Sequence, residues 1–373
     1  MTKSDIIIAG GGIIGCATAY YLVQKGFSVT VIEKDEIGAG GSSRNGGGVR
    51  QSARDLREMP LALYSVRNMW PGLSDELGTD VEYVQKGNLR LGKTPAHMKR
   101  LDDIVQQGKS VGLGLEVLSQ EEVKEVCPYV SDEVIGAILC PTDGHANPML
   151  ATLAYYKKAK ELGVTFVVGE EVLEVVLDKG KVGGVRTNVD VHKAPQVLLA
   201  AAYNSGLISK SFGVYLPMQN ILIEALITEE LPPMFPQMLG TALADFYGHQ
   251  TKHGSFVFGG STGLEPFLLE DESNVTRSIT APTLCRAILG YFPWMKDVNI
   301  IRTWSGFKDQ MFDQIPVLSN IDEIPGLTMA CGFTGHGFGI APATGMLLAE
   351  LVAGEETTLP LDAFRYDRFK PKG

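Results

Sequence analysis

A glycine-rich segment near the start of the chain carries the strongest chemical signal. Residues 10–15 read GGGIIG, a complete GxGxxG pattern. In this pattern Gly10 permits a tight turn, Gly12 lets the backbone approach a pyrophosphate, and Gly15 lets a helix pack closely on a strand. Glu33, 18 residues after Gly15, can accept hydrogen bonds from an adenosine ribose. This spacing predicts a dinucleotide site.

Three elements must position these residues. The apolar run at residues 6–9 predicts a buried parallel strand, and residues 13–25 predict a helix that Gly26 ends. Residues 29–32 predict a second strand that leads to Glu33. This order places a pyrophosphate at the helix N-terminus, where backbone N–H groups favour an anion. A plain glycine-rich turn, the alternative interpretation, would need none of this order.

NAD and FAD share this pattern, so the next glycine-rich segment decides between them. Residues 34–48 read KDEIGAGGSSRNGGG. A turn between strands does not need fifteen such residues. FAD, in contrast, needs a second loop of amides and hydroxyls beside its pyrophosphate and ring. The segment therefore favours FAD.

The two segments together resemble a known family. Glu33 and Lys34, the glycine-serine loop and the RNGG string at residues 44–47 are similar to the FAD site of the glycine oxidase/sarcosine oxidase/D-amino-acid oxidase family. Residues 44–51, RNGGGVRQ, most resemble the flavin (beta) subunits of heteromeric proline dehydrogenase and sarcosine oxidase. The resemblance implies an α/β plus α+β chain. It implies a discontinuous Rossmann-type FAD-binding domain at residues 1–83, 146–214 and 299–373, and a sheet-containing substrate domain at residues 84–145 and 215–298.

The resemblance also implies which residues contact FAD. Residues 163–168 and 171–176 are expected to form strands, and in the family this region closes over the adenine. Residues 331–340 are expected to form a loop before a helix at 341–352, with amides facing the flavin pyrimidine edge. At residue 201, alanine stands where the family usually has a glycine, which puts close approach to the pyrophosphate there in question. The predicted FAD contacts are Gly10, Gly12, Ile13, Ile14, Gly15, Glu33, Lys34, Ser42, Ser43, Arg44, Asn45, Gly46, Gly47, Val172, Ala200, Ala201, Gly306, Gly332, Gly335, His336, Gly337, Phe338, Gly339 and Ile340.

Three residues are candidates for action on the substrate. Arg50 matches a family arginine that binds the substrate carboxylate, with a purely structural arginine as the alternative. Lys308 stands where relatives often have an arginine, and it offers a point charge rather than a bidentate fork. His336 lies inside the predicted flavin loop, where it contacts substrate or flavin N1, or only packs. Structural roles are favoured for Arg54, Arg57 and His145.

These features predict FAD-dependent oxidation of an amino acid or secondary amine to the imine, by hydride transfer to flavin N5. The expected substrates are of the proline, sarcosine, glycine or N-substituted amino acid type. Two alternatives stay open, a free amino-acid oxidase producing hydrogen peroxide and a flavin-carrying scaffold subunit active only in a complex. Residues 254–263 match the stretch where an oxygen-activating lysine would lie, and they contain no lysine, which favours a dehydrogenase. The FAD is expected to be noncovalent, because neither Cys nor His occurs at residues 33–60 or 304–330.

Composition narrows the setting. The formal net charge of −10 over 373 residues disfavours a nucleic-acid partner. The five cysteines form no CxxC pair, which favours a reducing compartment and a cytoplasmic location. No apolar stretch of about 18 residues predicts a transmembrane segment, and no metal site is predicted. The expected partners are a small amino-acid or amine substrate and other subunits of an electron-transferring complex.

Overall fold

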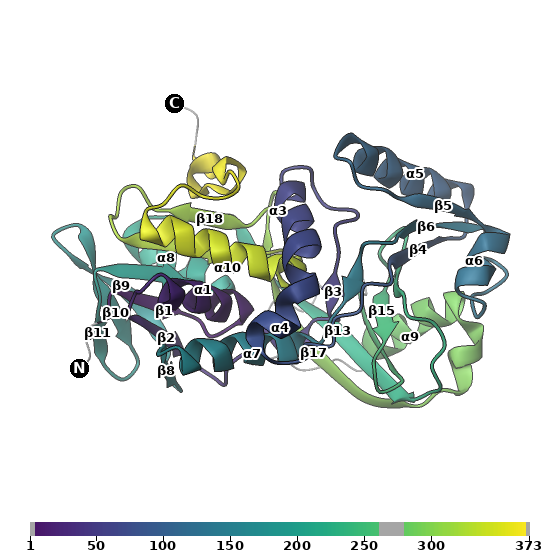
Figure 1. Ribbon diagram of the computed structural model, residues 1–373, viewed down its shortest axis with the longest axis horizontal. Coiled ribbons are helices and arrows are strands. Elements are labelled where there is room, and N and C mark those ends of the chain that lie inside the picture. The colour runs from purple at the N-terminus through teal and green to yellow at the C-terminus, as the bar shows by residue number, and fades with distance from the viewer. Residues whose placement is uncertain (1–3, 261–279, 371–373) are drawn as a thin grey trace.

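A six-stranded sheet organises one half of the molecule (Figure 1). The computed structural model describes residues 4–260 and 280–370. The central strand β1 (Ile6–Ala9) pairs in parallel with β2 (Val29–Glu33) and with β12 (Gln196–Leu199). The sheet has the order β18-β19-β12-β1-β2-β8, completed by β8 (Thr165–Val168), β18 (Val317–Asn320) and β19 (Leu327–Cys331). Its strands come from both ends of the chain, so this sheet is discontinuous in sequence.

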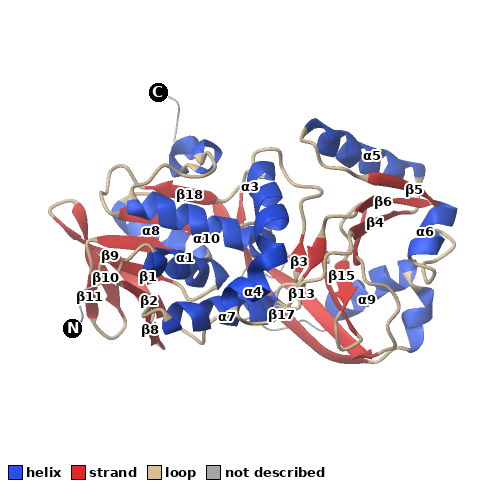
Figure 2. Ribbon diagram, viewed as in Figure 1, coloured by secondary structure: helices blue, strands red, loops and turns tan. Residues whose placement is uncertain are grey.

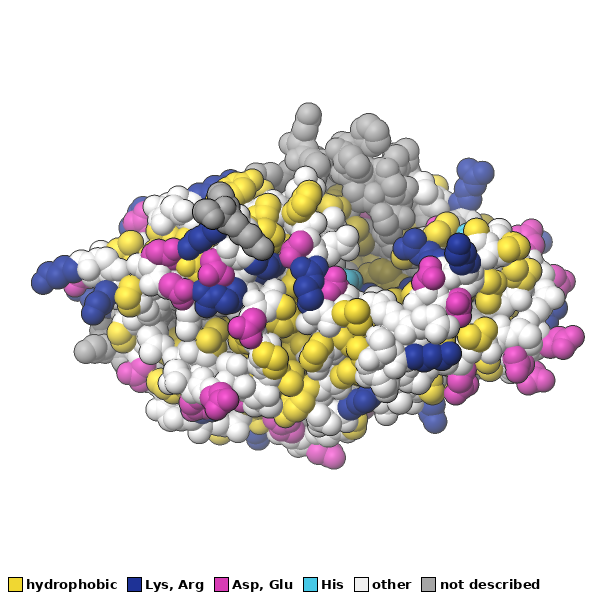
Figure 3. All heavy atoms as spheres, turned by 90° about the horizontal axis from the view of Figure 1, so that it is seen from above, with side chains coloured by type: hydrophobic (Ala, Val, Ile, Leu, Met, Phe, Trp, Pro, Cys, Tyr) yellow, Lys and Arg dark blue, Asp and Glu magenta, His cyan; other side chains and the backbone are white. Residues whose placement is uncertain are grey.

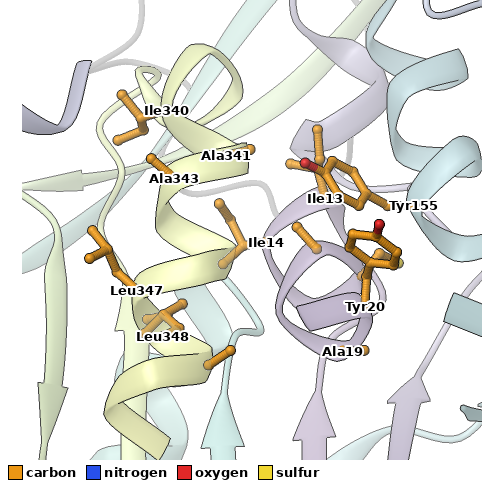
Figure 4. Packing of buried hydrophobic residues seen from close by; sticks show 14 of the residues in the cluster. Ile13, Ile14, Ala19, Tyr20, Tyr155, Ile340, Ala341, Ala343, Leu347 and Leu348 are labelled. Atoms are coloured by element: carbon orange, nitrogen blue, oxygen red, sulfur yellow. The ribbon is translucent and has the colours of Figure 1, made fainter. Parts of the chain in front are cut away.

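Two helices from opposite ends of the chain cover one face of this sheet. Helix α1 (Ile13–Gln24) packs against α10 (Gly337–Ala353), with Ile14 between them (Figure 4). The helices approach closely because Gly345 has no side chain, and a Cβ there would lie 2.6 Å from the Cβ of Ala17. On the other side of α1, Tyr20 meets Tyr155 of α7 (Pro148–Glu161) edge to face. Asn147 caps α7 by accepting the Leu150 N–H, as its position before Pro148 predicts.

An eight-stranded sheet forms the other half (Figure 2). Helix α9 (Thr280–Tyr291) packs on one face of this sheet. Every second residue of a strand points to this face, and Phe258, Leu239 and Leu89 belong to the apolar core that lies there. The other face of the sheet therefore looks away from α9. The order is β17-β13-β16-β15-β14-β4-β6-β5, with β4 (Asn88–Gly92), β5 (Glu116–Ser119), β6 (Gly136–Cys140), β13 (Met218–Glu230), β14 (Met238–Thr241), β15 (Tyr247–Gln250), β16 (Ser255–Gly260) and β17 (Ile300–Met311).

Smaller elements link and extend the two halves. The two-stranded pair β3 (Gly48–Val49) and β7 (Gly144–His145) lies between the large sheets. A three-stranded antiparallel sheet extends from the six-stranded half and consists of β9 (Val172–Asp178), β10 (Lys181–Thr187) and β11 (Val191–Lys193). The remaining α-helices are α2 (Gly41–Arg44), α3 (Met59–Tyr64), α4 (Leu73–Leu77), α5 (Pro95–Ser110), α6 (Gln120–Val126) and α8 (Tyr203–Ser209).

The mixed α/β architecture with a second sheet confirms the predicted fold class, and the predicted strand-helix-strand unit at the start of the chain is present. Two local expectations were wrong. Residues 41–44 form a helical turn instead of loop, and α10 begins at Gly337, one turn before the predicted start at residue 341. The predicted domain boundaries stay a prediction; β17, inside the range 299–373, pairs with β13 in the eight-stranded sheet. Within the described ranges, no helix is long and apolar enough to cross a membrane.

Candidate functional site

The turn between β1 and α1 is built by glycines that no other residue can replace without movement. Gly10 has φ +112°, and a Cβ there would lie 2.4 Å from the Ala200 carbonyl oxygen. A Cβ on Gly15 would lie 2.0 Å from the Gly10 carbonyl oxygen. Both separations are far below van der Waals contact. The turn therefore stays tight enough for the helix N-terminus to meet a ligand at the sheet edge.

The N-terminus of α1 is prepared for an anion. Gly12 is its N-cap and provides no side-chain cap. Ser42 accepts the Ile13 N–H at 2.9 Å, which brings the second glycine-rich segment onto this end of the helix. Ile14 is buried in the helix–helix core, and Ser43 follows Ser42 in α2, half-buried. The Ile13 N–H is therefore occupied by Ser42, and the neighbouring N–H groups of Gly12 and Ile14, which donate to no side chain in the described structure, favour a phosphate.

Glu33 lies over the glycine turn at the end of β2. Its carboxylate accepts the Gly11 N–H at 2.6 Å and the Asp35 N–H at 3.0 Å. Lys34, the next residue, lies 4.0 Å from the exposed Glu171 carboxylate, and Val172 begins β9 beside it. The Glu33 carboxylate, which is predicted to bind the ribose, is thus held by backbone N–H groups near the turn that is predicted to bind the pyrophosphate.

The residues that follow β12 complete the edge of the six-stranded sheet at which the glycine turn lies. Ala200 packs its backbone against Gly10, and its N–H donates to the Ala9 carbonyl at 2.9 Å. The Ala201 N–H donates to Ser205 Oγ at 2.9 Å. Ala202, at φ +49°, takes a left-handed conformation that a glycine would take more easily. The backbones of Gly10 and Ala200 therefore approach each other closely with alanine at residue 201.

The loop at residues 38–48 is fastened to the eight-stranded sheet. Arg44 donates to the Ala39 carbonyl at 2.7 Å and to the Ser305 carbonyl at 2.8 Å, and its own carbonyl accepts the Trp304 indole N–H at 3.0 Å. Gly306 leaves room for this arginine, because a Cβ there would lie 2.8 Å from the Arg44 Cβ. Arg44 and Gly306 therefore shape the loop by packing on each other.

The same loop turns at Asn45–Gly47 under residues of β15. Asn45 closes the turn by accepting the Gly47 N–H at 2.9 Å. Gly47 has φ +71°. A Cβ on Gly46 would lie 2.5 Å from the Tyr247 ring, so the tyrosine covers this glycine. The backbone of residues 45–47 is thereby presented to the space between the two sheets.

The C-terminal glycine segment is organised by a buried carboxylate. Asp309 Oδ2 accepts the Gly332 N–H at 2.7 Å, and the Asp309 carbonyl accepts the Thr334 N–H at 3.0 Å. Burial raises the pKa of Asp309 to about 6, although these backbone donors oppose the rise. Gly335 has φ +77° and lies against the Lys308 side chain. A Cβ added at Gly335 would lie 3.0 Å from Lys308 Cδ.

The residues predicted as flavin-loop amides after Gly335 lie in the first turn of α10. The N–H groups of Gly337, Phe338 and Gly339 have no partner within the helix, whereas the His336 N–H already donates to the Phe333 carbonyl at 2.8 Å. A Cβ on Gly339 would lie 3.1 Å from the Gly48 carbonyl oxygen, so this helix touches the first flavin loop. Helix α10 includes Gly337, Phe338, Gly339 and Ile340, of which Phe338 and Ile340 pack into the core.

A buried ion pair supports the substrate side of this helix. Arg54 and Glu58 pair at 3.0 Å with both side chains about 1% exposed. Glu58 also lies 3.3 Å from His336 Nδ1, and Arg54 donates to the His336 carbonyl. Burial lowers the pKa of His336 to about 4, so the ring is neutral at pH 7. Arg54 thus has the structural role that the sequence favoured.

Arg50 lies next to this cluster with no carboxylate of its own in the described part of the chain. Its guanidinium donates to the Ser52 and Ala53 carbonyls at 2.8 and 3.2 Å. Burial, followed by repulsion from Arg54 and Arg90, lowers the pKa of Arg50 to about 9, which still leaves it charged at pH 7. The Arg50 charge also acts on the Tyr247 phenol. An unpaired guanidinium in such a site is suited to an anionic ligand.

These contacts fit FAD. The first glycine turn, the start of α1, the Glu33 carboxylate and the start of α10 meet at one edge of the six-stranded sheet, and the loop at residues 38–48 joins them. The family model described as "FAD dependent oxidoreductase" matches residues 5–351. The chain belongs to this DAO family. Its cofactor is FAD.

This FAD-dependent oxidoreductase is similar along its whole length to named proteins. It is 30% identical to the beta chain of sarcosine oxidase from Arthrobacter sp, covering 98% of this chain and 91% of that protein. It is 26% identical to "Glycine oxidase" of Bacillus subtilis (strain 168), covering 98% and 97%. The crystal structure of L-proline dehydrogenase from P. horikoshii matches with a TM-score of 0.90 and 30% identity, covering 98% of each chain.

Several residues of the site were not found from the sequence. Asp309 and Glu58 are buried carboxylates whose partners lie far away in sequence or on another element. Only the Arg54–Glu58 spacing of four residues was a visible signal. The rings of His145 and His249 stack at 3.9 Å beside Gly47, because β7 and β15 bring them together. His145 is therefore more than the loop contact that the sequence suggested.

The stacked histidines predict that the enzyme loses stability in mild acid. Burial lowers the pKa of His145 to about 4, and burial with repulsion from His145 lowers that of His249 well below its usual 6.5. The unfolded chain takes up protons as pH falls through 6.5, whereas the folded chain does not. Unfolding free energy should fall by up to about 2 kcal/mol per histidine between pH 6.5 and 5. Asp309, whose folded pKa is raised, opposes part of this loss between about pH 6 and 4.

Urea unfolding of the wild type and of His249→Gln at pH 7 and pH 5 measures this effect. The variant should show the smaller difference between the two pH values. His253→Gln is the matched control, because the His253 side chain is 81% exposed. Equal pH dependence in the wild type and His249→Gln would contradict the assignment.

We expect the FAD to be released by acid. A covalent bond would need a reactive Cys or His at the site, and Cys331 and His336 of the C-terminal glycine segment are engaged otherwise: His336 Nδ1 lies 3.3 Å from the Glu58 carboxylate. Cys331 is fully buried in the β19 core, and burial raises the pKa of its thiol. Acid precipitation should leave the yellow colour in the supernatant, and colour that stays in the pellet would show a covalent bond.

Proposed function

We propose that this enzyme oxidises a secondary or primary amino acid to the imine. The proposal rests on the Arg50 guanidinium, which lies between the flavin loop and the eight-stranded sheet. It is shielded from water and forms no ion pair with a carboxylate of the described residues. A carboxylate bound there would lie beside the flavin loop, whose Gly46 is covered by the Tyr247 ring. The names of the relatives, the sarcosine oxidase beta chain, glycine oxidase and L-proline dehydrogenase, support an α-amino carboxylate as the substrate.

The residues of the chain position the substrate and keep it reactive. When bound, FAD supplies the hydride acceptor. Arg50 binds the carboxylate, which fixes the orientation of the Cα–H. The neutral His336 adds no positive charge near the substrate nitrogen, which must lose its proton before oxidation. The start of α10 favours negative charge at the pyrimidine edge of the cofactor. Lys308 lies at Gly335, and the carboxylate of its neighbour Asp309 offsets its charge.

Anaerobic bleaching of the 450 nm flavin absorbance tests this function. The purified holoenzyme is mixed with L-proline, sarcosine, glycine and N-methylated amino acids, and with the corresponding amines that lack a carboxylate. We expect rapid bleaching by at least one amino acid and none by its decarboxylated amine. Bleaching by amines alone, or by 2-hydroxy acids alone, would reject the proposed substrate class.

We further propose a dehydrogenase over an oxidase. The basis is the stretch 254–263, which contains no lysine for oxygen activation. Its residues 255–260 form β16, and residues 261–263 lie outside the described part. The substrate-reduced enzyme should be reoxidised by an artificial acceptor dye at least ten times faster than by air-saturated buffer. Equal rates would support the free oxidase that produces hydrogen peroxide.

The scaffold alternative is tested by the same bleaching experiment. Several relatives are named as subunits of larger enzymes, among them one chain of the opine oxidase of Rhizobium meliloti at 24% identity. We propose that the chain works with other subunits that receive its electrons. Bleaching of the isolated chain by substrate would show that it contains its own active site, whereas bleaching only after addition of partner subunits would favour the scaffold.

A further inference from the structure

Arg90 is a half-buried cation that no step of the proposed reaction uses. It lies on β4, and its Nε is buried with no hydrogen-bond partner in the described structure. Its single hydrogen bond, from Nη1 to the Thr241 carbonyl, is 3.5 Å long. No carboxylate forms an ion pair with it among the described residues. A guanidinium left in this state is costly unless a ligand completes its hydrogen bonds.

The strand register shows where Arg90 points. Tyr247, Gly240 and Arg90 lie opposite one another on β15, β14 and β4. Residues in register share one face of a sheet, and this face is the one turned away from α9. Tyr247 contacts Gly46 of the flavin loop, so the face looks toward the flavin loop.

Gly240 has no side chain, which leaves room on this face of the sheet between Arg90 and Tyr247. A Cβ at Gly240 would lie 3.6 Å from Arg90 Cγ and 3.9 Å from its guanidinium carbon. The arginine therefore lies along the sheet over this glycine. Arg50 reaches this strand from the flavin loop: its guanidinium donates to the Ser52 carbonyl at 2.8 Å, and the Ser52 hydroxyl lies 3.5 Å from the amide nitrogen of Asn88, two residues before Arg90 on β4. In Figure 3 the surface is hollowed between the half that carries α3 and the half that carries α5.

The charged groups around Arg50 and Arg90 leave an excess of one positive charge. Among the groups that are not exposed, three guanidiniums, of Arg50, Arg54 and Arg90, face two carboxylates, of Glu58 and Asp143; Arg100, which also acts on Arg90, is exposed to solvent. Asp143 is already satisfied by uncharged donors, the Gln51 N–H at 2.6 Å and the Ser52 hydroxyl at 2.5 Å. His336 is neutral, and Lys308 and its neighbour Asp309 offset each other. One carboxylate neutralises the cluster, whereas two would leave an excess negative charge.

We propose that Arg90 is a second anchor for the substrate carboxylate, shared with Arg50, and that the substrate is an amino acid with a single carboxylate. The inference rests on the proposed function and deepens it. Two guanidiniums from different elements fix the carboxylate from two directions, which restricts rotation of the Cα–H more than a single anchor does. A plain amine leaves both arginines without an anion, and a dicarboxylate overcompensates them.

Binding of unreactive ligands tests this proposal without turnover. The holoenzyme is titrated with pyrrole-2-carboxylate, pyrrole-2-carboxamide and pyrrole-2,5-dicarboxylate, and Kd is read from the change in the flavin absorbance spectrum. We expect the monocarboxylate to bind tightest. In Arg90→Gln its Kd should rise roughly 10- to 100-fold, and Arg90→Lys should recover part of the loss. Arg186→Gln, an exposed arginine paired with Glu174, should bind like the wild type.

The outcomes separate this proposal from the proposed function. Flavin content and thermal unfolding are measured for each variant, so that a folding defect in Arg90→Gln is recognised and Arg90→Lys then decides. Unchanged Kd for pyrrole-2-carboxylate in both variants overturns the anchor role. Tighter binding of the dicarboxylate overturns the single-carboxylate class. Carboxylate binding that depends on Arg90, without bleaching by any amino acid, upholds the anchor while rejecting the proposed reaction.

Discussion

Gly15→Ala is expected to lose FAD. The added Cβ would lie 2.0 Å from the Gly10 carbonyl oxygen, and that oxygen belongs to a backbone turn with little room to move. The start of α1 must shift by more than an ångström, which moves the N–H groups that meet the pyrophosphate. The ratio of absorbance at 450 nm to 280 nm in the purified protein should fall at least tenfold.

Gly114→Ala is the matched control for this change. A Cβ at Gly114 meets nothing within 4 Å, and its φ is not in the left-handed region. This variant should keep the wild-type absorbance ratio. Circular dichroism of Gly15→Ala separates loss of FAD from loss of the fold. Full flavin content in Gly15→Ala would show that the β1–α1 turn does not carry the pyrophosphate.

Arg50→Ala is expected to raise KM for the amino-acid substrate strongly. A charge-assisted pair to a buried carboxylate is lost, which costs about 2–4 kcal/mol and corresponds to roughly 30- to 1,000-fold in kcat/KM. Arg50→Lys keeps the positive charge but loses the bidentate geometry of the guanidinium, so its kcat/KM should lie between those of the wild type and Arg50→Ala. Steady-state kinetics with an acceptor dye measure the effect.

Arg57→Ala is the control for Arg50→Ala. Arg57 lies seven positions further along, its side chain is 43% exposed, and it pairs with Asp55 and Asp313 at the surface. It should change kcat/KM less than twofold. Flavin content must be compared as well, because Arg50 also donates to the Ser52 and Ala53 carbonyls. Kinetics of Arg50→Ala equal to those of the wild type would give Arg50 a structural role only.

The nucleotide-binding half of the fold could be predicted because its signals are local. The residues of β1, the glycine turn, α1 and Glu33 follow one another within 33 positions, and each has a direct physical reason. The boundary of α10 was misplaced because the glycines and Pro342 near its start are weak helix formers. Tertiary contacts override this preference, since the Ser65 hydroxyl and the Trp70 indole both donate to the Gly339 carbonyl.

The substrate side could be predicted only where one segment contained the signal. Arg50 follows the flavin loop directly, so it could be proposed from the sequence, and its role stays a prediction. Arg90 gives no local signal, because its partners Tyr247 and Gly240 meet it only through strand pairing across more than a hundred residues. The same holds for Asp309, which acts on Gly332 through a contact between β17 and the loop after β19. Buried polar residues of this kind become visible only once the strand register is known.

The arrangement of Gly15 on α1 and Gly339 on α10 has a consequence for synthesis on the ribosome. The two residues frame one cofactor site but are separated by more than three hundred positions in the chain. At about 5–20 residues per second, the first half of the site waits on the order of tens of seconds for the second. During that time β1 lacks its parallel neighbour β12 until residue 199 is made, and α1 lacks the apolar cover of α10. The nascent chain therefore exposes apolar surface for most of its translation, and chaperones that bind such surface are expected to engage it before FAD can.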